Sequence, residues 1–248
     1  MTSIGIYGSL GRMGQAIAAA APGMSARVAG GADVKDDPLA IAAAADVLID
    51  FSAPQALEAH LAAARAARKP IVVGTTGLSP QHHALIDAAA REIAVLQTGN
   101  TSLGIGLLQR LVREAAARLG PDWDIEIVEM HHRNKADAPS GTALMLGNAA
   151  AAGMGTTLAE AEVTDRAGTV GPRSSGTIGL ASLRGGSVVG DHSVVFATNG
   201  ERIELIHRAD DRAIFARGAV KAALWLAGKP AGRYTMDQVL EIGRASCR

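Results

Sequence analysis

Short apolar runs alternate with longer alanine-rich stretches through the first hundred residues. The runs are rich in β-branched residues and continuously apolar, which is typical of parallel strands covered on both faces. The stretches between them favour helices. The predicted strands are Ile4–Tyr7, Arg27–Ala32, Val47–Phe51, Ile71–Gly74 and Ile93–Gln97, and the predicted helices are Met13–Ala21, Pro38–Ala44, Pro54–Arg68 and Pro80–Arg91. This alternation indicates an α/β domain with a doubly wound parallel sheet.

The pattern changes after Asn100. A helix is predicted near Ile105–Leu119, with strands at Asp124–Met130, Thr177–Leu183 and Ser193–Thr198. This region indicates an α+β domain with a mixed or antiparallel sheet. The segment Arg212–Leu226 returns to helical spacing, with Ile214, Phe215, Val220, Ala223 and Leu224 as its apolar side, and we expect it to pack on the first domain. We therefore predict one domain at 1–102 with 212–248 and a second at 103–211.

Composition and charge narrow the function classes. Of the 248 residues 48% are apolar and 19% charged, so the chain is expected to be globular. Lys plus Arg equals Asp plus Glu at 24 each, which gives no general attraction to nucleic acid or to anionic membranes. No apolar run reaches the ~18 residues of a membrane span. The single cysteine, Cys247, cannot form an internal disulfide, and with no leader pattern at the N-terminus we expect a cytoplasmic protein.

A glycine-rich turn follows the first predicted strand. It reads Gly8-Ser9-Leu10-Gly11-Arg12-Met13-Gly14 and opens the first predicted helix, where glycines let the backbone approach a pyrophosphate and free N–H groups stabilise its charge. The spacing is G-x-x-G-x-x-G rather than G-x-G-x-x-G, because Leu10 stands where the second glycine is common. The turn predicts a dinucleotide site in a Rossmann-type domain, and an ordinary strand-to-helix turn is the alternative.

Asp33 ends the second predicted strand, about twenty residues downstream, where an acid commonly accepts hydrogen bonds from the adenosine ribose. A carboxylate there disfavours a 2′-phosphate, whereas Arg12 and Lys35 could pair with one. The residues favour NADH, with some use of NADPH.

The segment after the strand Asp124–Met130 concentrates charge. His131, His132 and Lys135 precede a Pro-Ser-Gly-Thr turn whose Gly141 and Thr142 open an apolar helix and offer N–H groups. This combination predicts a site for a small anion with several charges. A metal site is disfavoured because consecutive histidines on a strand point to opposite faces and no cysteine supports them. A solvated basic loop remains the other alternative. The remaining histidines, predicted to have core or surface roles, are His60, His82, His83, His192 and His207.

The chain resembles the dihydrodipicolinate reductase family over nearly its whole length. The resemblance is carried by Gly-x-x-Gly-Arg-Met-Gly at 8–14, Asp50-Phe51-Ser52 with Pro54, Gly74-Thr75-Thr76-Gly77, Asn100-x-Ser102-x-Gly104, and Glu129-x-His131-His132-Arg133-x-Lys135-x-Asp137-Ala138-Pro139-Ser140-Gly141-Thr142-Ala143. Shorter matches are Gly176–Gly179, Val189–His192 and Gly200–Arg202.

The resemblance implies reduction of 4-hydroxy-tetrahydrodipicolinate to tetrahydrodipicolinate by NADH or NADPH, in diaminopimelate and lysine biosynthesis. It implies acid/base roles for His131 and Lys135 and binding of a substrate carboxylate by His132, Gly141 and Thr142. The implied cofactor-contacting residues are Gly8, Ser9, Leu10, Gly11, Arg12, Met13, Asp33, Gly74, Thr75, Thr76, Thr98, Gly99, Asn100 and Thr101. It also implies a homotetramer assembled through the second domain.

Three features depart from the family pattern. The segment between Asp33 and Val47 is short, Thr101 replaces a frequent aromatic residue, and Val34 stands where some members carry an arginine for the 2′-phosphate. Two other functions remain as alternatives, a two-domain amino-acid dehydrogenase and a dinucleotide sensor without catalysis. The sensor would have no need for the cluster at His131 and Lys135.

Overall fold

The structure is a computed structural model that describes residues 1–240. The chain divides into two compact units, the first formed by Met1–Leu103 together with the segment from Ala213 onward, the second by Gly104–Arg212. Cys247 lies outside the described residues. None of the helices in residues 1–240 combines the length and the apolar character that crossing a membrane requires.

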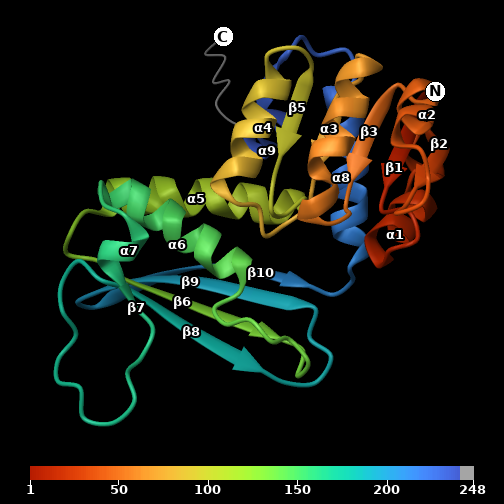
Figure 1. The fold of residues 1–248 in the computed structure, drawn as a ribbon. Coiled ribbons are helices and arrows are strands. Elements are labelled where there is room, and N and C mark those ends of the chain that lie inside the picture. The colour runs from red at the N-terminus through yellow and green to blue at the C-terminus, as the bar shows by residue number, and fades with distance from the viewer. Residues whose placement is uncertain (241–248) are drawn as a thin grey trace. The chain divides into compact units, whose positions relative to one another are not determined.

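The first unit is built on a six-stranded sheet in which every described pairing is parallel (Figure 1). Its order is β11-β5-β4-β3-β1-β2. The strands are β1 (Thr2–Tyr7), β2 (Ala26–Ala32), β3 (Val47–Asp50), β4 (Ile71–Val73), β5 (Ala94–Gln97) and β11 (Gly232–Tyr234). The helices are α1 (Arg12–Ala20), α2 (Pro38–Ala44), α3 (Leu57–Ala66), α4 (Pro80–Ala90), α8 (Ala213–Leu226) and α9 (Met236–Val239), with short 3-10 turns at Pro22–Met24 and Pro54–Ala56.

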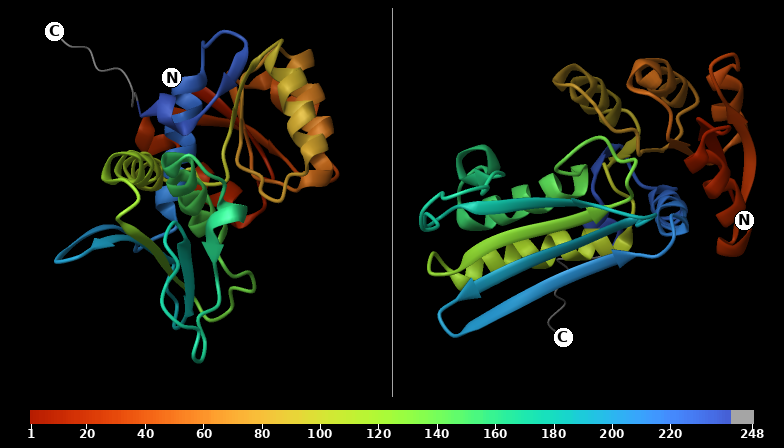
Figure 2. Two further views of the ribbon diagram at one scale, coloured as in Figure 1. Left: turned by 90° about the vertical axis from the view of Figure 1, so that its left-hand side faces the viewer. Right: turned by 90° about the horizontal axis from the view of Figure 1, so that it is seen from below.

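Helices cover both faces of this sheet. Ile17 of α1 and Val220 of α8 belong to the apolar cluster on one face, and Leu57 of α3 and Ile86 of α4 belong to the cluster on the other. Figure 2 shows α3 and α4 across the sheet from α8. All of β3 is buried, as the continuous apolar runs predicted. The predicted doubly wound parallel sheet is confirmed.

Helix α8 packs on the first unit, as predicted, but only part of its predicted apolar side is buried. Val220 and Ala223 are buried, whereas Ile214, Phe215 and Leu224 are only partly buried. The buried side consists of Ala216, Gly218, Ala219, Val220, Ala222, Ala223 and Leu226. These small residues allow a close approach, since a Cβ atom at Gly218 would lie 1.8 Å from the Thr101 carbonyl oxygen. Backbone proximity, which apolar periodicity does not reveal, decides which side faces inward.

The second unit contains a five-stranded mixed sheet of order β10-β9-β6-β8-β7. The strands are β6 (Asp124–His131), β7 (Glu162–Val163), β8 (Ile178–Arg184), β9 (Gly190–Thr198) and β10 (Glu201–Ala209). Strand β6 pairs antiparallel with β9 and parallel with β8. Helices α5 (Leu103–Leu119) and α6 (Gly141–Met154) cover one face, and α7 (Leu158–Ala161) packs on α6 (Figures 1 and 2). The predicted mixed sheet is confirmed.

Candidate functional site

The glycine-rich turn connects β1 to α1 and depends on its glycines. Gly8 has a φ of +77°, which favours glycine, and a Cβ atom at Gly14 would lie 2.3 Å from the Gly8 carbonyl oxygen. Gly11, the N-cap of α1, has no side chain with which to cap the helix. The N–H groups of the first turn are therefore available to an anion.

Asp33 lies against this turn from the end of β2. One of its carboxylate oxygens accepts hydrogen bonds from the Ser9 hydroxyl at 2.6 Å and from the Leu10 N–H at 3.0 Å. Two predicted cofactor-binding segments, which are 23 and 24 positions apart at these two hydrogen bonds, therefore lie in contact.

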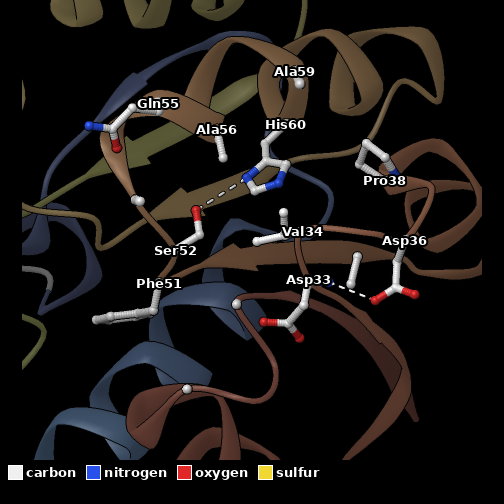
Figure 3. Close-up of a pocket in the computed structure, with 14 residues that line it drawn as sticks. Asp33, Val34, Asp36, Pro38, Phe51, Ser52, Gln55, Ala56, Ala59 and His60 are labelled. Atoms are coloured by element: carbon white, nitrogen blue, oxygen red, sulfur yellow. Dashed lines mark hydrogen bonds between the residues drawn. The ribbon is translucent and has the colours of Figure 1, made fainter.

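A pocket of about 560 Å³ opens beside the turn (Figure 3). It lies at the carboxyl ends of β1 and β3, where the strand order reverses, which is the usual ligand position in such sheets. Its size is within the range of small-molecule sites. The lining residues are Gly8, Gly11, Ala32, Asp33, Val34, Asp36, Pro38, Phe51, Ser52, Ala53, Gln55, Ala56, Ala59 and His60. Their only charged carboxylates are Asp33 and Asp36, and neither Lys nor Arg is among them.

A buried carboxylate supports the pocket wall. Asp50 is fully buried and accepts hydrogen bonds from the Ser52 hydroxyl at 2.6 Å and the Thr75 hydroxyl at 3.1 Å, and its other oxygen lies 3.0 Å from His60 Nδ1. Tyr7 stacks on the His60 ring, and burial raises the pKa of Tyr7. These contacts hold His60 in place where Figure 3 shows it beside the pocket, so a histidine predicted to have a core or surface role is both buried and pocket-lining.

The other two predicted cofactor segments follow neighbouring strands, Gly74–Thr76 after β4 and Thr98–Thr101 after β5. Gly74 is in contact with Phe51, whose ring a Cβ atom there would meet at 2.3 Å. The buried Thr75 hydroxyl donates to Asp50, and the buried Thr101 hydroxyl donates to the Phe215 carbonyl. The side chains of Thr75 and Thr101 therefore support the two segments from inside the unit.

In the second unit, His131 is the last residue of β6 and is buried. Its Nδ1 atom lies 2.6 Å from a carboxylate oxygen of Glu129. Lys135 follows in the next loop, where its ammonium group donates to both oxygens of Asp137 at 2.8 and 2.9 Å. The buried imidazole of His131 at the end of the strand is thus followed in the loop by the partly exposed ammonium group of Lys135.

Helix α6 begins directly after this loop. Ser140 is its N-cap, and its hydroxyl accepts a hydrogen bond from the Ala143 N–H at 3.1 Å. Gly141 and Thr142 are the first two residues of the helix. His132 is half-buried and is the first residue of the loop, directly after His131. Positive charge and a helix N-terminus together suit a carboxylate.

Sequence reasoning missed three residues of this cluster, Glu129, Arg184 and His192. Glu129 accepts hydrogen bonds from His131, the Arg184 guanidinium and the Ser140 N–H. Burial would raise the pKa of Glu129, but the bonds from Arg184 and His131 outweigh it and lower the pKa to about 2. His192, predicted to have a core or surface role, lies 3.1 Å from the Ser140 hydroxyl, and burial, with a smaller contribution from its neighbour His131, lowers its pKa to about 4. The spacing Glu129-x-His131 on a strand, which places both on one face, could have signalled Glu129.

Among residues 1–240, His, Cys, Asp and Glu form no cluster that could hold a metal ion.

Family models and relatives identify the family. The model described as dihydrodipicolinate reductase, N-terminus, matches residues 2–101, and the model described as dihydrodipicolinate reductase, C-terminus, matches residues 104–240. The chain belongs to the dihydrodipicolinate reductase family. It is 55% identical over 244 residues to the 4-hydroxy-tetrahydrodipicolinate reductase of Zymomonas mobilis, with 96% of each chain covered. It is 54% identical to the enzyme of the same name from Methylocella silvestris, over 86% of this chain and 78% of the relative.

Solved structures agree on the fold. A dipicolinate-bound dihydrodipicolinate reductase from Paenisporosarcina sp. TG-14 superposes with a TM-score of 0.75 at 22% identity, covering 95% of this chain and 97% of that one. The DAP dehydrogenase of C. glutamicum, in complex with DAP, gives a TM-score of 0.55 at 13% identity, covering 95% and 92%.

Proposed function

We propose that this member of the dihydrodipicolinate reductase family reduces 4-hydroxy-tetrahydrodipicolinate to tetrahydrodipicolinate in diaminopimelate and lysine biosynthesis. The reaction consumes one NADH or NADPH and one proton, and releases water. The observation that carries the proposal is the site at the end of β6, where His131, Lys135 and the N-terminus of α6 follow one another along a single segment. A dicarboxylate substrate requires such a site, whereas a protein that only senses a dinucleotide does not.

The first unit, assigned to 1–102 with 212–248, has the role of binding the dinucleotide. The pyrophosphate binds the turn from Gly8 to Met13, and the adenosine ribose binds Asp33. The backbone of Gly74–Thr76 and Thr98–Thr101 lies beside the nicotinamide. When bound, the nicotinamide supplies the hydride.

The second unit, assigned to 103–211, binds the substrate. One carboxylate is held by His132 and by the N–H groups of Gly141 and Thr142. Lys135 delivers a proton to the departing hydroxyl or to the ring nitrogen, and His131 is the second acid/base group. Dipicolinate, to which the Paenisporosarcina reductase is bound in its solved structure, is a dicarboxylate of similar shape and supports this substrate class.

The same unit serves for oligomerisation in our proposal, with a homotetramer as the active form in the cytoplasm. Apolar side chains that are exposed on one face of its sheet support such an interface; these are Leu183 and Ile206. Sedimentation analysis tests the tetramer, and fractionation of cells tests the location.

The test of function is the oxidation of NADH by purified protein, with the substrate generated in place from pyruvate and aspartate semialdehyde by the preceding synthase. Oxidation that requires every component, repeated with NADPH, supports the proposal. Folded protein that binds NADH but oxidises none contradicts it. In that case pyridine-2,6-dicarboxylate should give no thermal stabilisation beyond that given by NADH, as expected of a dinucleotide sensor.

A further inference from the structure

Glu129 is a buried carboxylate to which the proposed reaction assigns no step. Its side chain is 1% exposed, and both of its oxygens are engaged. One oxygen lies 2.6 Å from His131 Nδ1 and 2.8 Å from Arg184, and the other accepts from Arg184 at 2.9 Å and from the Ser140 N–H at 3.1 Å. The same carboxylate therefore joins the end of β6, the end of β8 and the start of α6.

The ionisation of Glu129 decides which nitrogen of His131 carries a proton. An ionised carboxylate only accepts hydrogen bonds, so Nδ1 of His131 must be the donor. The neutral ring then carries its lone pair on Nε2, which is the nitrogen that can take up and release a proton. Without this contact either nitrogen could hold the proton.

Two further residues hold the ring from other sides. A Cβ atom at Gly190 would lie 3.0 Å from His131 Nε2, closer than ordinary van der Waals contact, so a larger residue there would press on the ring. The His192 ring meets the His131 ring edge-on, with centroids 5.2 Å apart, and is itself 3.1 Å from the Ser140 hydroxyl. Carboxylate, glycine and neighbouring ring come from β6 and β9, so the sheet itself fixes the orientation of His131.

Arg184 extends the same arrangement into the loop that carries Lys135. Besides both Glu129 oxygens, its guanidinium donates to the Asp137 carbonyl at 2.6 Å, and the Asp137 carboxylate holds Lys135. Removing the Glu129 charge would therefore disturb His131 directly and Lys135 only through two intermediate residues.

We propose that Glu129 is the positioning residue of the active site, which orients His131 and fixes its proton on Nδ1 so that Nε2 faces the reacting atoms. The proposal rests on the acid/base role of His131 in the proposed function. Glu129 acts through His131 and contacts no substrate.

The test is the substitution Glu129→Gln, which keeps the shape and removes the charge. We expect kcat to fall on the order of 10²-fold, as for loss of an effective acid/base group, while the Kd of NADH stays unchanged. The pH profile of kcat should move to lower pH, because a neutral amide no longer stabilises a positive charge on the ring. In a His131→Asn background, Glu129→Gln should cause little further loss, since the two residues act as a unit.

Glu126→Gln is the matched control. Glu126 lies on the same strand but on the opposite face, and binds Arg166 and Arg173 rather than the site. It should leave kcat and the pH profile as in the wild type.

Nitrogen-15 NMR of the His131 ring separates this proposal from the proposed function, because it needs no turnover. A proton on Nδ1 in the wild type that moves towards Nε2 in Glu129→Gln supports the positioning role, even if the protein reduces no substrate. If the wild type turns over substrate and Glu129→Gln shows the same kcat and pH profile, the proposal is overturned. It is also overturned if the His131 ring of the wild type is protonated on Nε2 alone.

If Glu129→Gln does not fold, Gly190→Ala replaces it. The added methyl group crowds Nε2 and leaves Glu129 intact, so kcat should fall with NADH affinity unchanged. Gly23→Ala is its control, because a Cβ atom at Gly23 meets nothing within 4 Å. Full activity of Gly190→Ala would show that the ring orientation does not matter, and would overturn the proposal.

Discussion

The Asp33 carboxylate accepts a 2.6 Å hydrogen bond from the Ser9 hydroxyl, which ties the end of β2 to the glycine-rich turn. This contact holds a negative charge at the rim of a pocket whose lining includes Asp36 and neither Lys nor Arg. A 2′-phosphate placed there would lie beside two carboxylates, with neither Lys nor Arg among the lining residues, whereas a ribose hydroxyl could donate to Asp33. The charge of the rim therefore bears directly on the choice between NADH and NADPH.

We expect NADH to be the preferred cofactor, with a kcat/KM about tenfold or more above that of NADPH, equivalent to about 1.4 kcal/mol. Asp33→Asn should reduce this ratio, because it removes one of the two charges that repel a 2′-phosphate. Steady-state kinetics with both cofactors measures the ratio. Asp122→Asn, an exposed substitution in the other unit, is the control. A wild type that prefers NADPH would contradict this account of the pocket.

Gly14 tests the turn itself. Because a Cβ atom there would lie 2.3 Å from the Gly8 carbonyl oxygen and 2.6 Å from Ser9 Cα, Gly14→Ala should displace the turn and raise the Kd of NADH at least about tenfold, or about 1.4 kcal/mol. Calorimetric titration with NADH measures the effect. Gly23→Ala, outside the turn and at a position where a Cβ atom would meet nothing within 4 Å, should leave the Kd of NADH unchanged. Equal losses in the two variants would show that crowding is not the cause.

Lys135 tests the assignment of acid/base roles. Lys135→Ala should lower kcat by about 10²-fold or more, the contribution expected of a proton donor, while the Kd of NADH stays within about twofold of the wild type. Lys229→Ala is a matched control, because Lys229 contacts Trp225 in the first unit. Normal turnover of Lys135→Ala would remove Lys135 from the mechanism.

Sequence features that lie close together along the chain predicted the fold of the first unit well. The turn at Gly8–Gly14 and Asp33 could be recognised because strand, glycines and helix follow one another directly. His207 was expected on the second sheet, but no bounds were predicted for its strand β10 (Glu201–Ala209), since the residues are mostly polar and exposed and the strand is held by antiparallel pairing with β9. Its position depends on that partner rather than on apolar periodicity.

The cluster around Glu129 was beyond reach for a related reason. His131 and Lys135 were found because they lie in one short string, but Arg184 is 55 positions from Glu129, and His192 is 52 positions from Ser140. Only the pairing of β6 with β8 and β9 brings these side chains together. The distant partners of a buried carboxylate cannot be identified until the register of the sheet is known.

The buried imidazole of His192 predicts a pH-dependent stability. Its folded-state pKa is lowered from 6.5 to about 4, through burial first and the nearby His131 second. The unfolded chain therefore takes up the proton first as the pH falls, so this contribution to stability is complete above pH 6.5 and is lost between 6.5 and about 4. At about 1.4 kcal/mol per pH unit, the free energy of unfolding falls by up to about 3 kcal/mol.

The second unit can be observed separately. Trp123 packs on its core and Trp225 on that of the first unit, so a Trp225→Phe background leaves Trp123 as the reporter. Urea unfolding, monitored through Trp123 fluorescence, should show this loss of unfolding free energy as the pH falls. His192→Asn should make the free energy of unfolding less dependent on pH between 6.5 and 4.5. Below pH 4.5 both proteins should still lose stability as Glu129, whose folded-state pKa is about 2, protonates in the unfolded chain. If the free energy of unfolding changes with pH equally in the wild type and in His192→Asn above pH 4.5, the His192 ring is not the group responsible.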